Sequence, residues 1–290
     1  MNKKIVVFRD DTKSKEADEF IRKNGFTLPF QIFQILSFLI FIVIVTFIIC
    51  ISALNTNPIF ITFYIFFGIL TITILVLSYI VTSINPIDPL SFKYINRIAN
   101  EEEIKGLYEC DICGFVEPQS KHCKVCNKCV SVFDHHCMWV NNCIGKKNYK
   151  YFVSLLLALT IFHCFVFLFC GVTFFMSLKH DLIKDQWNNF YGSYNDALFY
   201  TLICTLFVLN GIFFILVIQL FGLHIYLISK KMTTYEYIIN RSNSEDKEKM
   251  GIKTFFEWII IDKKRLKKNV SQSEQDIENL KVEAERSIKY

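Results

Sequence analysis

Long apolar runs without charge alternate along this chain with polar segments that carry almost all of its charged residues. Four runs contain no Asp, Glu, Lys or Arg, and each exceeds the roughly 20 residues that a helix needs to cross a bilayer. They extend over residues 28–54, 58–84, 151–178 and 197–228. Because only a helix satisfies its own backbone in hydrocarbon, the pattern predicts four membrane-spanning helices. The first run is longer than the core of a signal peptide, so we expect it to be a retained helix.

The composition supports a membrane protein. Hydrophobic residues make up 52% of the 290 residues and charged residues only 20%, below the roughly 25% typical of soluble domains. With ten Gly, five Pro and an apolar excess, the chain is neither collagen-like, disordered nor a disulfide framework.

Basic residues predict the orientation of the spans. Of the 32 Lys and Arg, seven lie in residues 1–27, nine in 85–150 and fourteen in 229–290, which leaves two in the loop 179–196. The positive-inside rule therefore predicts that both termini and the loop 85–150 are cytosolic. Basic residues beside an anionic leaflet account for the net charge of +5, so no nucleic-acid partner is expected.

The expected fold class is an all-α membrane protein: four transmembrane helices with a small cytosolic cysteine-rich zinc domain between helices two and three. The expected domains are a cytosolic N-terminal segment (1–27), helices one and two (28–84), the cysteine-rich domain (85–150), helices three and four (151–228) around a luminal loop (179–196), and a cytosolic tail (229–290).

Cysteines are concentrated in the loop between the second and third runs. Seven of the eleven Cys fall within residues 110–143. The cytosol is reducing, so metal binding is favoured there over disulfides. The order is Cys110-x2-Cys113, His122-Cys123-x2-Cys126-x2-Cys129, Asp134-His135-His136-Cys137 and Cys143. A Cys-x2-Cys step lets two thiolates of one tight turn reach the same tetrahedral zinc.

Counting these ligands suggests a second chemistry. The window holds seven Cys and three His, and two closed tetrahedral sites use eight ligands. One Cys and one His are then left over, and the Asp134-His135-His136-Cys137 run is where such a pair would be adjacent. A free thiol beside a histidine and a carboxylate is a nucleophile with a base and an orienting acid. The count does not identify the spare Cys. It is also compatible with all ten residues binding no metal directly.

These residues resemble a known family, the DHHC protein S-acyltransferases or palmitoyltransferases. The similarity is close over residues 110–152, with Asp134-His135-His136-Cys137, Trp139, Asn141-Asn142-Cys143-Ile144-Gly145, Asn148 and Phe152. It extends to Asp88-Pro89 after the second run and to Thr233-Thr234-Tyr235-Glu236 after the fourth. Together with the four spans, it covers about residues 28–240.

The resemblance implies a role for each of these side chains. One structural Zn²⁺ would be held by Cys110, Cys113, His122 and Cys129, and a second by Cys123, Cys126, His136 and Cys143. In the family, the Cys at position 137 becomes the acyl-enzyme, the His at 135 is the base and the Asp at 134 orients it.

The implied activity is that of a protein S-palmitoyltransferase. It would transfer a long-chain acyl group from acyl-CoA (palmitoyl-CoA) to cysteine thiols of membrane-associated protein substrates, through a thioester on Cys137 at the cytosolic membrane face. The expected location is a multi-pass protein of an endomembrane, Golgi or ER, with the plasma membrane as the alternative. Met138, Leu90 and Gln119 replace the family's usual Pro, Gly and basic residue, and none of them removes an implied ligand or catalytic group.

Some polar and bulky residues have simpler interpretations. Asn210 and Gln219 are costly in lipid, so we expect both to face the helix bundle, with a helix-bridging hydrogen bond favoured over a substrate contact. Phe162, in the third run, is a candidate substrate-binding residue whose ring would close an acyl cavity and set the chain length, with ordinary packing as the alternative. We interpret Thr233, Thr234 and Glu236 as helix caps or as polar contacts that hold the tail to the membrane face, and in either case as structural.

Three other classes of protein compete with the acyltransferase. A zinc-dependent membrane adaptor without catalysis is disfavoured by the intact Asp134-His135-His136-Cys137 run. A RING-type ubiquitin ligase needs longer ligand spacings than this window contains. A transporter would need a polar pathway, and no charged residue lies inside a run.

Overall fold

A computed structural model describes residues 20–52, 58–96, 108–179 and 182–243. The expectations for residues 1–19, for parts of the loops and for the tail beyond residue 243 lie outside these ranges. Four long helices, each within four residues of a predicted run, are α1 (Ile32–Ser52), α2 (Pro58–Ser83), α5 (Tyr149–Lys179) and α7 (Asp196–Ser229). All four are long and apolar enough to cross a membrane, so the predicted fold class is confirmed.

Helix α5 is the central helix of the bundle. Its most extensive helix contacts are with α7 and α2, and it has the largest share of buried positions among the four spans. Phenylalanine rings fill the α2–α5 contact, where Phe63 lies 4.8 Å from Phe165 and 5.2 Å from Phe169 between ring centroids. The Phe rings at this contact therefore serve helix packing, which in a membrane depends on van der Waals contact.

A buried polar pair joins α5 to α7. His163 and Asn210 exchange two hydrogen bonds, between the His163 Nδ1 and the Asn210 Oδ1 (2.7 Å) and from the Asn210 Nδ2 to the His163 carbonyl oxygen (3.1 Å). The expected helix-bridging bond of Asn210 is thus confirmed. The same expectation was wrong for Gln219, which is exposed on α7. Nine positions separate the two residues, which at about 100° per residue puts them on opposite helix faces.

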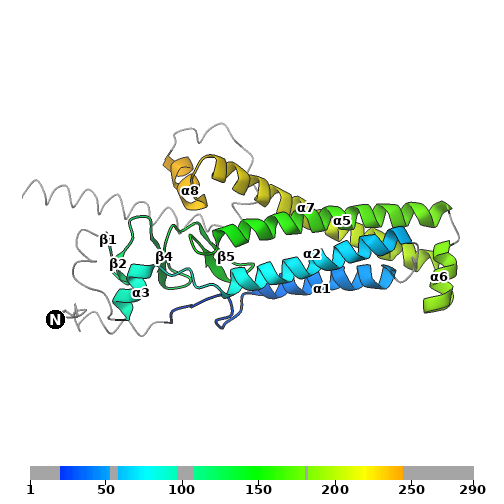
Figure 1. Cartoon of the computed structure of the whole chain (residues 1–290), viewed down its shortest axis with the longest axis horizontal. Coiled ribbons are helices and arrows are strands. Elements are labelled where there is room, and N and C mark those ends of the chain that lie inside the picture. Colours follow the sequence, from blue (N-terminus) through cyan, green and yellow to red (C-terminus); the bar gives the residue numbers. More distant parts are fainter. Residues whose placement is uncertain (1–19, 53–57, 97–107, 180–181, 244–290) are drawn as a thin grey trace, which may run out of the picture. The chain divides into compact units, whose positions relative to one another are not determined.

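Six short strands form three antiparallel hairpins at one end of the long helices (Figure 1). The hairpins are β1 (Tyr108–Cys110) with β2 (Gly114–Val116), β3 (Lys121–Cys123) with β4 (Lys128–Val130), and β5 (His135–Cys137) with β6 (Asn142–Ile144). A short helix, α3 (Pro89–Ile95), precedes them, and α8 (Thr234–Asn243) follows α7.

The predicted loop 179–196 contains a helix, α6 (Leu182–Tyr191), at the opposite end of the bundle from the hairpins (Figure 1). Its polar composition did not predict a helix. Ile183 and Trp187 are buried, and the Trp187 ring lies 5.9 Å from that of Phe199 at the start of α7. One apolar face packed on the bundle therefore stabilises this segment, as is usual for amphipathic helices.

Buried polar side chains attach the hairpins to the ends of the long helices. The Asn142 Nδ2 in β6 donates to the carbonyl oxygens of Val81 (3.0 Å) and Ile84 (2.8 Å), which lie at the end of α2. Asn148, just before α5, donates from its Nδ2 to the Cys143 carbonyl oxygen (2.9 Å). The last carbonyl groups of a helix lack partners within it, so the bonds from Asn142 to the end of α2 fix hairpin β5–β6 against the bundle.

Candidate active site and metal clusters

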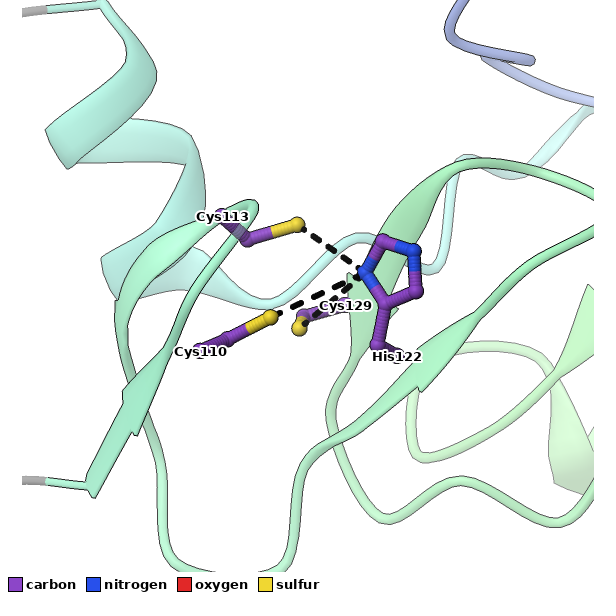
Figure 2. Close-up of side chains that lie close together, drawn as sticks. All are labelled: Cys110, Cys113, His122 and Cys129. Atoms are coloured by element: carbon purple, nitrogen blue, oxygen red, sulfur yellow. Dashed lines mark hydrogen bonds between the residues drawn. The ribbon is translucent and has the colours of Figure 1, made fainter. Parts of the chain in front are cut away.

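The first cluster joins hairpins β1–β2 and β3–β4. Cys110 ends β1 and Cys113 lies in the turn before β2, while His122 and Cys129 face each other across the β3–β4 pair. Figure 2 shows the three sulfur atoms converging on the His122 Nδ1, at 3.3 Å from Cys113, 3.8 Å from Cys110 and 3.9 Å from Cys129. The four residues predicted to form one site are therefore together.

The second cluster joins hairpins β3–β4 and β5–β6. It consists of Cys123, Cys126, His136 and Cys143, with one side-chain atom of each within 4.8 Å of the others. The Cys126 Sγ lies 3.3 Å from the His136 Nδ1 and 3.4 Å from the Cys143 Sγ. Strand β3 contributes to both clusters, because His122 and Cys123 are successive residues whose side chains point to opposite faces.

In each of the two Cys-x2-Cys turns, the residue after the second cysteine has a left-handed backbone conformation. Gly114 follows Cys113 with a φ of +75°, and Asn127 follows Cys126 with a φ of +49°. Glycine and asparagine are the residues that adopt this left-handed region most readily. The Cys-x2-Cys-Gly and Cys-x2-Cys-Asn sequences therefore favour tight turns with both sulfurs on one side.

The spacing of both clusters fits a tetrahedral metal ion. With zinc bonds of about 2.3 Å to sulfur and about 2.0 Å to nitrogen, tetrahedral geometry places two sulfurs about 3.8 Å apart and sulfur and nitrogen about 3.5 Å apart. The sulfur–nitrogen distances here run from 3.3 to 3.9 Å, and one sulfur–sulfur distance is 3.4 Å. Each cluster can thus hold one metal ion with all four positions filled by protein.

Strand alternation separates the remaining histidine and cysteine from the second cluster. In β5, His136 pairs with Cys143 across the hairpin and joins the cluster. His135 and Cys137 precede and follow it, so their side chains lie on the other strand face. Cys137 is buried in the hydrophobic core that includes Phe152 and Leu155 of α5. The spare thiol therefore faces the membrane helices.

Asp134, His135 and Cys137 form a series of neighbouring groups. The His135 Nδ1 lies 2.6 Å from the Asp134 Oδ2, and the Cys137 thiol is close enough to the His135 ring to contribute to its raised pKa. Burial opposes the charge of the Asp134 carboxylate and by itself would raise its pKa. The hydrogen bond from His135 and the positive charge of that ring outweigh burial, so the pKa of Asp134 lies below its usual value. Burial likewise opposes the imidazolium, yet the bonds to Asp134 and Cys137 raise the pKa of His135 to about 10.

Thr234, interpreted from sequence as a cap, also contacts the candidate catalytic carboxylate. Its backbone N–H donates to the Asp134 Oδ1 (2.9 Å) and its hydroxyl to the Asp134 Oδ2 (2.8 Å). The cap itself is made by Thr233 and Glu236, whose side chains each accept the other's backbone N–H, at 3.1 and 2.8 Å. Thr234 thus has a second contact that spacing along the chain could not reveal.

His224, on α7, is a second residue that the sequence analysis missed. It is 1% exposed, and one of its ring nitrogens lies within 4.8 Å of the Asp134 carboxylate and the His135 ring. One signal was present: fourteen positions separate His224 from Asn210, which places both on about the same helix face. A polar ring on the packed face of a membrane helix is a candidate for function.

Phe162 is fully buried where α1, α2 and α5 meet. Its ring centroid lies 5.3 Å from that of Phe41 and 5.3 Å from that of Phe67. Phe152, ten residues earlier on α5, contacts His135 at 5.2 Å, so Phe162 is about 15 Å further along the helix.

Comparison with known proteins agrees with this geometry. Residues 100–241 match the family model described as DHHC palmitoyltransferase. Palmitoyltransferase ZDHHC8B of Danio rerio is 38% identical over 144 residues, which is 48% of this chain and 17% of the relative. Palmitoyltransferase ZDHHC14 of Homo sapiens is 33% identical over 150 residues, 50% of this chain and 28% of the relative. The similarity thus spans less than a third of either relative. The residues that match the DHHC palmitoyltransferase family model, 100–241, contain both clusters and the Asp134–His135–Cys137 series.

Proposed function

We propose that this chain is a protein S-palmitoyltransferase, which transfers a long-chain acyl group from acyl-CoA to cysteine thiols of membrane-associated proteins. The observation that supports it most is the buried Cys137 thiol two residues after His135, a histidine that is bonded to a buried carboxylate. This thiol lies outside both metal clusters and within the apolar core of the bundle. The family match of residues 100–241 supports the same activity.

In the first step, Cys137 becomes acylated. His135 takes the thiol proton, and Asp134 holds the imidazole with its Nδ1 toward the carboxylate. The Cys137 thiolate attacks the thioester carbonyl of acyl-CoA, the bond between that carbon and the CoA sulfur breaks, and the CoA sulfur takes the proton from His135. A free Cys is only a few per cent thiolate at neutral pH, so the reaction needs a base that takes the thiol proton.

In the second step, the acyl group passes to the substrate protein. His135 takes the proton of the substrate thiol, which attacks the Cys137 thioester, and the Cys137 sulfur leaves and is protonated again. One thioester replaces another, so the reaction needs little driving force and follows two-step, ping-pong order.

The acyl chain would lie between the helices. Burial contributes about 0.8 kcal/mol per CH₂, so a C16 chain favours an apolar site next to Cys137. Cys137 and Phe162 belong to the same buried apolar cluster, which supports Phe162 as the residue that closes an acyl cavity.

Two structural Zn²⁺ ions would hold the cytosolic domain of residues 85–150. One would be bound by Cys110, Cys113, His122 and Cys129, and the other by Cys123, Cys126, His136 and Cys143. With four protein ligands each, such ions supply folding free energy, and the acyl transfer is left to the residues of the Asp134–His135–Cys137 series.

We also propose that the hairpins and both termini are cytosolic, in an endomembrane such as Golgi or ER. The hairpins belong to the segment 85–150, which carries nine Lys and Arg, and they lie at the opposite end of the long helices from α6, whose segment 179–196 carries two; this supports the orientation.

The test is acylation of the full-length protein in detergent with palmitoyl-CoA, followed by intact-mass spectrometry. The wild type and Cys164→Ser, which changes an exposed cysteine of α5, should each gain one hydroxylamine-labile palmitoyl group. Cys137→Ser should gain none. Equal labelling of Cys137→Ser would exclude the enzyme, and a zinc-loaded wild type without label would favour the adaptor.

A further inference from the structure

We propose that His224, held by the Tyr149 hydroxyl, is a positioning residue that fixes the His135 imidazole for proton exchange with Cys137. This inference rests on the proposed function, since it concerns the base of that reaction. It adds two residues, one on α7 and one at the start of α5, to a site otherwise built from β5 and α8.

The rings around His135 form a closed group. His135 lies 5.2 Å from Phe152 and 6.0 Å from His224 between ring centroids, and Phe152 lies 5.1 Å from His224. Each ring thus contacts the other two. A histidine ring rotates easily about its last side-chain torsion, so the bond to Asp134 alone leaves its plane free to swing. Phe152 and His224 restrict that rotation.

His224 is itself fixed by one hydrogen bond. Its Nδ1 lies 3.1 Å from the Tyr149 hydroxyl, across the α5–α7 contact. A hydroxyl can donate to an unprotonated ring nitrogen, so we assign Tyr149 as donor and the histidine hydrogen to Nε2. A phenylalanine at position 224 would provide a similar ring contact to His135 but no hydrogen bond to Tyr149. The histidine therefore offers a fixed ring orientation that an apolar residue cannot.

A second pair of the same kind provides an internal comparison. His163 and Asn210 also join α5 to α7, and His163 lies fourteen residues after Tyr149 just as Asn210 lies fourteen before His224. The two bridges are about 21 Å apart along the helices. Both histidines are buried, at 6% and 1% exposure, but among the described residues only His224 is grouped with Asp134 and His135. Either pair could serve to hold α5 against α7, but only the Tyr149–His224 pair lies beside the candidate catalytic residues.

The experiment measures acyl-enzyme formation by the full-length protein in detergent at a series of palmitoyl-CoA concentrations. His224→Phe should lower kcat about tenfold, since small misplacements of a catalytic group have large effects, while KM stays within twofold. Tyr149→Phe, which removes only the hydroxyl, should lower kcat about threefold. Because the hydroxyl acts through the histidine, the double variant should equal His224→Phe alone.

His163→Phe is the matched control, because it removes the other bridge with the same substitution. It should lower the Tm as much as His224→Phe and leave kcat within twofold of wild type. Equal kcat losses in the two histidine variants, or kcat within twofold of wild type in both His224→Phe and Tyr149→Phe, would overturn the positioning role. Additive losses of kcat in the double variant would show that the Tyr149 hydroxyl does not act through His224. A wild type that forms no acyl-enzyme would instead overturn the proposed function, and this role with it.

Discussion

At the scale of single residues, the Asp134 carboxylate is the best-satisfied group of the site. It accepts hydrogen bonds from the Thr234 backbone and hydroxyl and from the His135 ring, and it is 2% exposed. A buried carboxylate with three donors remains ionised, because each donor favours the charged form. It can therefore orient His135 and stabilise the imidazolium without taking its proton.

Removal of one donor should weaken this orientation. Thr234→Val keeps the backbone N–H and the shape of the side chain but loses the hydroxyl bond to Asp134. A hydrogen bond to a charged group contributes about 1.5–3 kcal/mol, so the rate of Cys137 acylation should fall about tenfold or more. Thr233→Val, which loses only the cap, should lower the Tm without this loss of rate. Equal rates in both variants would contradict the assignment.

The raised pKa of His135 makes a second prediction at this scale. Bonding to Asp134 and Cys137 outweighs burial and raises that pKa to about 10. The protonated ring thus stabilises the fold fully below its unfolded pKa of about 6.5, and this contribution is lost as the pH rises through 10. The Tm of the wild type should fall more between pH 7 and pH 10 than that of Asp134→Asn. A parallel fall in both proteins would show that the ion pair contributes nothing.

At the scale of elements, a close backbone approach joins the segment before α1 to hairpin β5–β6. Gly25 donates from its N–H to the Thr82 carbonyl oxygen at the end of α2 (2.9 Å). A methyl group at Gly25 would lie 2.1 Å from the Val140 carbonyl oxygen, within the turn between β5 and β6. No larger residue fits there without a backbone shift.

Gly25→Ala should therefore loosen the hairpin from the bundle. Overpacking of this kind typically costs about 1–3 kcal/mol, which should appear as a lower Tm. Gly68→Ala in α2 is the matched control, because a methyl group there meets nothing within 4 Å and alanine favours a helix. If the Tm values of the two variants match, the segment does not hold the hairpin.

Sequence periodicity could predict the helices but not their facing partners. Apolar runs predict α1, α2, α5 and α7 because crossing a bilayer requires length and low charge, which are local properties. The polar sequence of α6 did not predict a helix, because packing against the bundle and not the local sequence stabilises it. Cys-x2-Cys spacing predicted a metal-binding window, and family resemblance divided its ligands into the two sets that the structure brings together. The contacts of Thr234 and His224 with Asp134 join positions about a hundred residues apart, which no spacing encodes.

At the scale of the whole molecule, hairpins β1–β2 and β3–β4 depend on the clusters more than on a hydrophobic core. The apolar groups around their cysteines are small and consist mostly of the cysteines themselves, with Val130 and Val116, whereas Val140 and Ile144 of hairpin β5–β6 belong to the core of the long helices. Strands of three residues are too short to be stable alone. Metal ions bound at the two clusters would then supply much of the folding free energy of this region. Since β3 supplies a residue to each cluster, loss of one ion should also disturb the other.

Metal content therefore tests the architecture as a whole. The purified wild type should contain two zinc ions per chain by elemental analysis, and Cys137→Ser should keep both, since Cys137 belongs to neither cluster. His122→Ala removes one ligand of the first cluster and, through β3, should reduce the content below one ion per chain. A strong chelator should lower the Tm of wild type and Cys137→Ser alike. Retention of a full second ion by His122→Ala would show that the clusters fold independently, and loss of zinc from Cys137→Ser would place Cys137 among the ligands.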